Sequence, residues 1–277
     1  MERSGDSSPK GEEESWTFVT SKRHRQTGKR KAVPLASATV PVTKPSPQAR
    51  ASTHLSLQEI QLDHEKFSRQ WAESECCRRL QELLSSKECS SRPTKAICLG
   101  LGSFDPEDGS WQIRRRSHVQ LAAFITIVKR LEASDKIKIR CIFQEPCFTN
   151  ADKKFLQTLG FEVVDSPSGF DEVSEDSILF GVHLYRDIYS AAIEKAIPAI
   201  FIGTGYDIWE DYATAEASEW AKMRQLDECC DKAVFPDDKD FYPIFTSTTI
   251  HWRRPGEKDL GGLSKAVEDM SLVGDSG

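Results

Sequence analysis

The central part of the sequence alternates between short apolar runs and longer segments with helical periodicity. The apolar runs, each expected to contain a β-strand, lie at 95–103, 137–144, 161–165, 177–183 and 199–204. Helical patterns separate them at 114–133, 151–159 and 185–196. Five strands separated by helices predict a parallel sheet with right-handed crossovers and helices on both faces. We therefore expect a Rossmann-like three-layer α/β domain with a mostly parallel sheet over residues 93–254, completed by a helix over 213–233 and a strand near 245–252.

The segment before this domain has the pattern of an amphipathic helix. Ser56 and Glu59 have the spacing of a capping box, which satisfies free amides at a helix start. Apolar and aromatic residues then follow at spacings of three and four, at Leu57, Ile60, His64, Phe67 and Trp71, and continue less regularly through Leu80, Leu83 and Leu84. Residues 51–92 are thus expected to form a helix and linker that pack on the α/β domain.

Both ends of the chain are poor in residues that build a core. Residues 1–50 mix Ser, Pro, Thr and charge, and burial cannot offset the entropy of ordering such a segment. We expect a disordered basic arm over 1–50 and a flexible tail over 255–277. The arm contains the cluster KRHRQTGKRK at 22–31, which is consistent either with a nuclear address or with a solvated charge run.

Composition narrows the classes of function and the compartment. The formal net charge of −6 argues against a general polyanion binder, so nucleic acid is not an expected partner. No apolar stretch reaches the roughly 20 residues that cross a bilayer, and the first residues lack a secretory signal. Eight cysteines without any CxxC spacing indicate free thiols rather than disulfides or a metal site. We expect a cytoplasmic protein, with the nucleus as the alternative, and no membrane partner.

Glycines and polar residues follow the predicted strands at the edge where ligands of open α/β sheets bind. The first strand ends in Gly100, Gly102 and Ser103, where two glycines would let backbone amides approach a phosphate or carboxylate. This GxG lacks the third glycine of a dinucleotide fingerprint, and the loop to the next helix is long. A binding loop and a plain strand-ending turn both remain open.

Three further strand ends supply candidate ligand-binding residues. Glu145 follows the second strand, where many Rossmann domains place an acid against ribose hydroxyls, although a surface acid that caps its own loop also fits. His183 follows the fourth strand and is either a structural histidine or a group able to exchange protons near neutral pH. The end of the fifth strand supplies Gly203, Gly205 and Tyr206. We predict that Gly102, Glu145 and His183 converge on one cleft.

Several motifs together resemble the sensitivity-to-red-light-reduced family, including its animal members. They are KAICLGLGSF, the helix with HVQLAAF, QEPCFTNADKKFLQTLGFEVV, SILFGVHLYRDIYSAAI and IFIGTGYDIWEDY, which together cover about 95–212. Glu145-Pro146 matches the Asp-Pro pair that commonly ends the family's second strand. The Pro-His-Cys-Pro motif retains only His183, and the Gly-Asn-Ser-Phe motif is replaced by Gly203, Thr204, Gly205 and Tyr206.

The resemblance implies a regulatory function, connected with haem biosynthesis and circadian clock-gene expression, in which the α/β domain is a ligand sensor or docking platform. It implies neither a cofactor nor a catalytic residue, and the partner would be an unidentified small molecule or protein. The chain has no Cys-Pro dipeptide, the usual haem-regulatory motif. The alternative is a nucleotide-cofactor-dependent enzyme, of the methyltransferase or oxidoreductase type. No GxSxG, Walker or HExxH motif is present to support a hydrolase, NTPase or metalloprotease.

Overall fold

The computed structural model describes residues 54–87, 91–210 and 221–255. The predicted basic arm, with its cluster at 22–31, and nearly all of the predicted tail lie outside these ranges. Within them, no helix has both the length and the apolar character that crossing a membrane requires.

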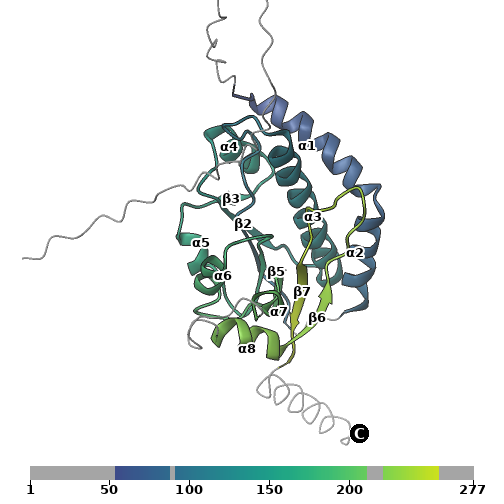
Figure 1. Ribbon diagram of the computed structural model, residues 1–277, viewed down its shortest axis with the longest axis vertical. Coiled ribbons are helices and arrows are strands. Elements are labelled where there is room, and N and C mark those ends of the chain that lie inside the picture. Colours follow the sequence, from purple (N-terminus) through teal and green to yellow (C-terminus); the bar gives the residue numbers. More distant parts are fainter. Residues whose placement is uncertain (1–53, 88–90, 211–220, 256–277) are drawn as a thin grey trace, which may run out of the picture. The chain divides into compact units, whose positions relative to one another are not determined.

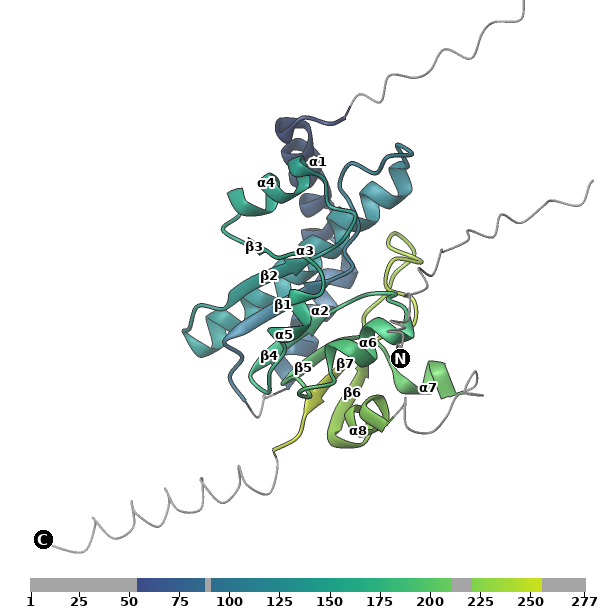
Figure 2. The same ribbon diagram turned by 90° about the vertical axis from the view of Figure 1, so that its left-hand side faces the viewer.

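The described residues form a seven-stranded sheet with the order β3-β2-β1-β4-β5-β7-β6, which can be followed in Figure 2. The first five strands are parallel, and β7 runs antiparallel to both β5 and β6. The strand bounds are β1 Lys95–Leu99, β2 Arg140–Gln144, β3 Glu162–Val163, β4 Ser177–Phe180, β5 Ile200–Thr204, β6 Cys230–Val234 and β7 Thr248–Arg253. The expected mostly parallel α/β sheet is confirmed.

Helices cover both faces of the sheet, as Figure 1 shows. One face packs against α1 (Leu57–Ala72), α2 (Glu75–Ser86), α3 (Trp111–Asp135) and α4 (Asn150–Thr158). The other packs against α5 (Ser168–Asp171), α6 (Arg186–Ala192) and α8 (Ala221–Cys229), while α7 (Tyr206–Glu210) follows β5 directly. Successive residues of β1 alternate between the two cores, because side chains of a strand point to opposite faces: Ala96 and Cys98 belong to one, Ile97 and Leu99 to the other.

The segment before β1 forms two helices rather than one. The capping box at Ser56 and Glu59 starts α1 as expected. The helix then ends after Ala72, and Ser74 begins α2 by accepting a hydrogen bond from the backbone of Cys77. A side-chain cap of this kind competes with helix continuation. Because a new helix starts here, the apolar stripe of α1 does not continue regularly beyond Trp71. Both helices pack on α3.

Two elements near the end of the domain differ from the prediction. The expected helix over 213–233 is wrong in its last residues, because Cys230–Val234 form the edge strand β6, while 211–220 lie outside the described residues. An edge strand pairs on one side only and carries exposed polar residues such as Lys232, so its sequence does not alternate clearly. The helix expected over 185–196 ends at Ala192, and β4 ends at Phe180, three residues before His183.

Trp71 provides a test of whether α1 belongs to the cooperative unit. Its side chain is 1% exposed, its Nε1–H donates to the Thr126 hydroxyl at 2.9 Å, and its ring meets that of Phe241 at 5.4 Å between centroids. We expect Trp71→Ala to lower the free energy of unfolding in urea by about 3–5 kcal/mol, because it leaves a large cavity. Trp111→Ala is the control, since Trp111 is 51% exposed and should cost far less. A loss below about 1 kcal/mol for Trp71→Ala would show that α1 is not part of the folded unit.

Buried histidines predict that acid destabilises the fold. Burial lowers the pKa of His118 to about 3 and the pKa values of His64 and His251 to about 4. The folded chain therefore resists protonation that the unfolded chain accepts below its histidine pKa of about 6.5. The stabilisation is complete above that pH and is lost as the pH falls from 6.5 towards 4, by up to about 1.4 kcal/mol per pH unit for each histidine.

The histidine contribution can be measured by urea unfolding at pH 7 and pH 5. His118 stacks among Phe67 and Phe104, with centroids 5.5 and 4.7 Å away, so His118→Phe removes a titrating group and keeps an aromatic ring. We expect the variant to lose less stability than the unsubstituted protein between the two pH values. Equal losses would show that His118 does not contribute.

Candidate functional site

The candidate site lies where the strand order reverses. From β1 the chain proceeds to β2 and β3 on one side, whereas β4 and β5 extend the sheet on the other side of β1. The connections that leave β1 and β4 therefore diverge, and they leave a crevice beyond the carboxyl ends of these strands. The loops that follow β1, β2 and β4 all reach this crevice.

A cavity of about 310 Å³ occupies the crevice. We call it the switch-point cavity, and it is lined by Leu99, Gly100, Gln144, Glu145, Pro146, Ser166, Phe170, His183, Leu184, Tyr185 and Ile188. The lining thus includes three of the predicted ligand-binding residues, Gly100, Glu145 and His183, although they follow three different strands. The volume lies near the lower end of the range for ligand pockets.

Glu145 joins the first two loops of the site. Its Oε2 accepts a hydrogen bond from the amide of Gly102 at 2.9 Å, and its Oε1 accepts from the amide of Cys147 at 2.9 Å. A carboxylate can accept about four hydrogen bonds, so these two leave acceptor capacity towards the cavity. Of the three residues predicted to converge on one cleft, Glu145 and His183 line the cavity, whereas Gly102 does not line it and contacts Glu145 through its amide.

The backbone at both glycines has a conformation that disfavours a side chain. Gly100 and Gly102 have φ of +66° and +81°, a region that L-residues rarely adopt. A Cβ at Gly100 would lie 2.0 Å from Cδ2 of Leu184, so the Leu184 side chain packs directly on this glycine. At Gly100, the close approach that a binding loop would offer to a ligand is made by Leu184, a residue of the loop after β4.

Ser103 anchors the loop after β1 to α4. Its hydroxyl donates to Oδ2 of Asp152 at 2.6 Å, and the other oxygen of Asp152 accepts from the amide of Phe104. Asp152 also completes the capping box of α4 with Thr149, and burial raises the pKa of its carboxyl group. Ser103 is buried and lines neither cavity of the site, so its contribution is to position the loop.

His183 lies between two cavities of the site. It has φ of +57°, which is a strained conformation for a residue with a side chain. Its Nε2 lies 2.6 Å from the carbonyl oxygen of Thr246. Because a carbonyl only accepts, Nε2 must carry the hydrogen, and Nδ1 of the neutral ring is an acceptor.

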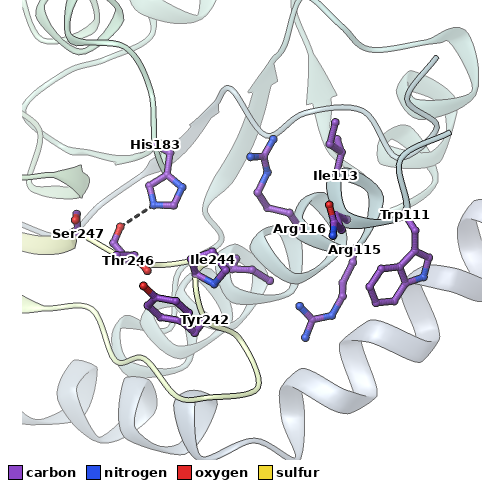
Figure 3. A pocket seen from close by; sticks show the side chains of 11 residues that line it. Trp111, Ile113, Arg115, Arg116, His183, Tyr242, Ile244, Thr246 and Ser247 are labelled. Carbon is purple, nitrogen blue, oxygen red and sulfur yellow. Dashed lines mark hydrogen bonds between the residues drawn. The ribbon is translucent and has the colours of Figure 1, made fainter. Parts of the chain in front are cut away.

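A second, larger cavity also has His183 in its lining (Figure 3). We call it the α3 cavity; its volume is about 790 Å³, and it separates the start of α3 from the loop before β7. Its lining consists of Trp111, Gln112, Ile113, Arg115, Arg116, His183, Tyr242, Pro243, Ile244, Thr246 and Ser247. His183 is the residue that lines both cavities.

The residues predicted after the fifth strand lie apart from both cavities. Gly203 is buried in the sheet, where a Cβ would come within 2.8 Å of the Gly181 carbonyl and of the Tyr189 ring. At Gly205 a Cβ would lie 2.5 Å from Oδ1 of Asp207. Tyr206 packs against the core on the α6 and α8 face. The close packing at Gly203 explains that glycine without a ligand, whereas at Gly205 the neighbouring atom belongs to the exposed Asp207 side chain, which can move aside.

Apart from His183, sequence patterns did not identify the residues of the α3 cavity. The run Arg114-Arg115-Arg116 at the start of a long helix was a usable signal, since it places positive charge beside the first strand's loop. The loop residues Tyr242 and Ser247 could not be assigned, because no periodicity places a loop of this kind over another part of the chain. Among the described residues, no group of three or more His, Cys, Asp or Glu side chains has the arrangement of a metal site.

Comparisons with known proteins identify the family. The comparison with curated proteins gives no match. Among solved structures, the SAH-bound methyltransferase PaMTH1 of Podospora anserina is similar at 11% identity and a TM-score of 0.33, over 71% of this chain and 88% of that chain. The Thermoplasma acidophilum protein 1320 is similar at 11% identity and a TM-score of 0.29, over 65% and 98%. Likeness at these scores does not bear on function.

The family model of the SRR1 domain matches residues 77–252. This range is wider than the 95–212 covered by the sequence motifs, and it takes in most of α2 and both final strands. The chain therefore belongs to the SRR1 family.

Proposed function

We propose that this chain is a regulatory protein that binds a small polar molecule in the switch-point cavity. The observation that carries the proposal is the meeting of Gly100, Glu145 and His183, from three separate loops, around one cavity at the reversal of strand order. In open α/β sheets this is the position at which ligands bind. Nothing in the proposal requires a chemical reaction.

The polar groups of the cavity favour a ligand that donates hydrogen bonds. Glu145 keeps acceptor capacity beyond its two backbone partners, and Nδ1 of His183 accepts as well. Both groups are held by bonds to backbone atoms, so they lose little freedom when a ligand binds. A small molecule with hydroxyl or amino groups fits this set of acceptors.

Binding at His183 would change the hydrogen bond between His183 and the loop before β7. The Nε2–H of His183 donates to Thr246, which lies two residues before β7, whereas Nδ1 faces the ligand in our proposal. A ligand that reorients this ring would change the support of the loop, whose surface is available to a protein partner. Haem biosynthesis and clock-gene expression are the processes that membership of the family suggests for this regulation, and the cytoplasm is the compartment we propose.

A nucleotide-cofactor-dependent enzyme is the second candidate, because Glu145 follows β2 where such enzymes place an acid against ribose. Two contacts weigh against it. The Leu184 side chain covers the glycine at which a pyrophosphate would approach, and Glu145 is bonded to the Gly102 amide that would receive it. We therefore rank this alternative below a regulatory binding protein.

Matched pairs of variants test the switch-point cavity as the working site. Gly102 and Gly160 have φ of +81° and +80°, so alanine should cost a similar backbone strain at either position, about 1–2 kcal/mol. At Gly102 the added Cβ also comes within 3.0 Å of the Ser117 hydroxyl, whereas nothing lies within 4 Å at Gly160, so the abundance of both variants has to be compared. Glu145→Ala removes a carboxylate from the cavity, and Glu65→Ala removes an exposed one from α1. We expect Gly102→Ala and Glu145→Ala to lose function, and Gly160→Ala and Glu65→Ala to retain it.

The measurement is rescue of cells that lack the protein, with haem content and clock-gene transcript amplitude as readouts and variant abundance measured in the same cells. Rescue by the two control variants and failure by the two site variants, at equal abundance, supports the proposal. If Gly102→Ala and Glu145→Ala restore both readouts, the cavity is not the working site.

The proposed compartment has its own test. A tagged full-length chain should be mainly cytoplasmic, since the basic cluster at 22–31 is the one nuclear cue in the sequence and has low specificity. Imaging should show little change when Lys29, Arg30 and Lys31 are replaced by Ala. An exclusively nuclear signal that disappears with this substitution would contradict the proposal.

A further inference from the structure

The lining of the α3 cavity contains positively charged side chains and no negatively charged ones. Arg115 and Arg116 line it, and none of its lining residues is an Asp or Glu. The cavity also lies at the start of α3, a helix of 25 residues whose first turn contains no acidic residue. The partial positive charge of a helix N-terminus therefore adds to the two guanidinium groups.

The two arginines differ in how they are held. The Nη2 of Arg115 donates to the carbonyl of Asp240 at 2.6 Å, and its guanidinium lies over the rings of Trp111 and Phe241, at 5.9 and 5.4 Å from their centroids. Arg116 makes no hydrogen bond or ion pair with any residue in the described ranges, and its Nη2 lies 4.0 Å from the position of a Cβ on Gly102. Arg115 is thus fixed as part of the wall, while Arg116 is available to an anion.

The same cavity has aromatic walls that are exposed to solvent. Trp111 is 51% exposed and Tyr242 is 65% exposed, which is unusual for side chains of this size. Figure 3 shows them on either side of the two arginine side chains. A planar ring could stack on either wall while an attached anion reaches Arg116.

Residues with a strained backbone conformation line this cavity. Of the non-glycine residues with positive φ in the described ranges, two of three, His183 at +57° and Ser247 at +58°, line it. Strained conformations of this kind persist where the surrounding structure holds them, and they are concentrated at binding sites. The strain is an observation independent of the charge and of the aromatic walls.

From these observations we infer that the α3 cavity binds a phosphorylated aromatic small molecule, of the class of the nucleoside monophosphates. The phosphate pairs with the Arg116 guanidinium at the start of α3, and the ring stacks on Trp111 or Tyr242. The cavity volume of about 790 Å³ is within the range for ligands of this size. The α3 cavity shares only His183 with the switch-point cavity, and the inference does not rest on the proposed function.

Calorimetric titration of the full-length chain tests the inference with the four common nucleoside monophosphates, adenosine and inorganic phosphate as probes. We expect at least one monophosphate to bind saturably below millimolar concentration, and adenosine and phosphate to bind at least about tenfold more weakly, because each makes only part of the contact. Arg116→Ala should weaken binding of the monophosphate by about tenfold or more and leave adenosine unchanged. Trp111→Ala should weaken both.

Lys129→Ala is the matched control, since it removes an exposed cation from the same helix about 20 Å further along. It should bind the monophosphate as the unsubstituted chain does. The inference is overturned if no monophosphate binds at millimolar concentration, if phosphate alone binds equally well, or if Arg116→Ala and Trp111→Ala bind normally. Binding that is lost in Glu145→Ala but kept in Arg116→Ala also overturns it, and would place the nucleotide in the switch-point cavity.

Discussion

The position of β1 between two parallel neighbours is the constraint on which the rest of this structure depends. Because β1 pairs with β2 on one side and β4 on the other, all in the same direction, every connection among them must cross over a face of the sheet. Helices then cover both faces, and the loops after β1, β2 and β4 emerge at one edge. The candidate site follows from this arrangement rather than from any single motif.

The sequence predicts well the central parallel strands, which are the elements that this constraint governs. The central strands are buried on both faces, so they appear as continuous apolar runs, and β1, β2, β4 and β5 lie where those runs are. The edge strand β6 was expected to be helical because Cys230–Val234 mix exposed charge with apolar residues and show no alternation. The break between α1 and α2 depends on a hydrogen bond from Cys77 to Ser74, which spacing alone does not distinguish from a continuing helix.

The sequence predicts the candidate site only in part: it identifies residues that follow strands but not the contacts between loops. Gly100, Glu145 and His183 could be placed at one edge because each follows a strand that the pattern identifies. The bond from Gly102 to Glu145 and the packing of Leu184 on Gly100 depend on loop conformation, which has no periodicity to read. Gly203 shows the opposite error: a glycine at the end of a strand suggested a ligand, whereas the Tyr189 ring and the Gly181 carbonyl leave no room for a side chain there. The α3 cavity was missed because five of its eleven lining residues come from the irregular loop before β7.

The central claim is that a ligand binds at the carboxyl edge of the sheet, and amide chemical shifts test it most directly. A ¹⁵N-labelled full-length chain would be titrated with the low-molecular-weight fraction of a cell extract, with the amides of Gly100, Gly102, Cys147 and His183 assigned. The account predicts saturable shifts concentrated at these amides, since they belong to the loops around Glu145 and His183. Saturable shifts confined to other surfaces, such as α8 and β6, or no shifts at these amides, would contradict it.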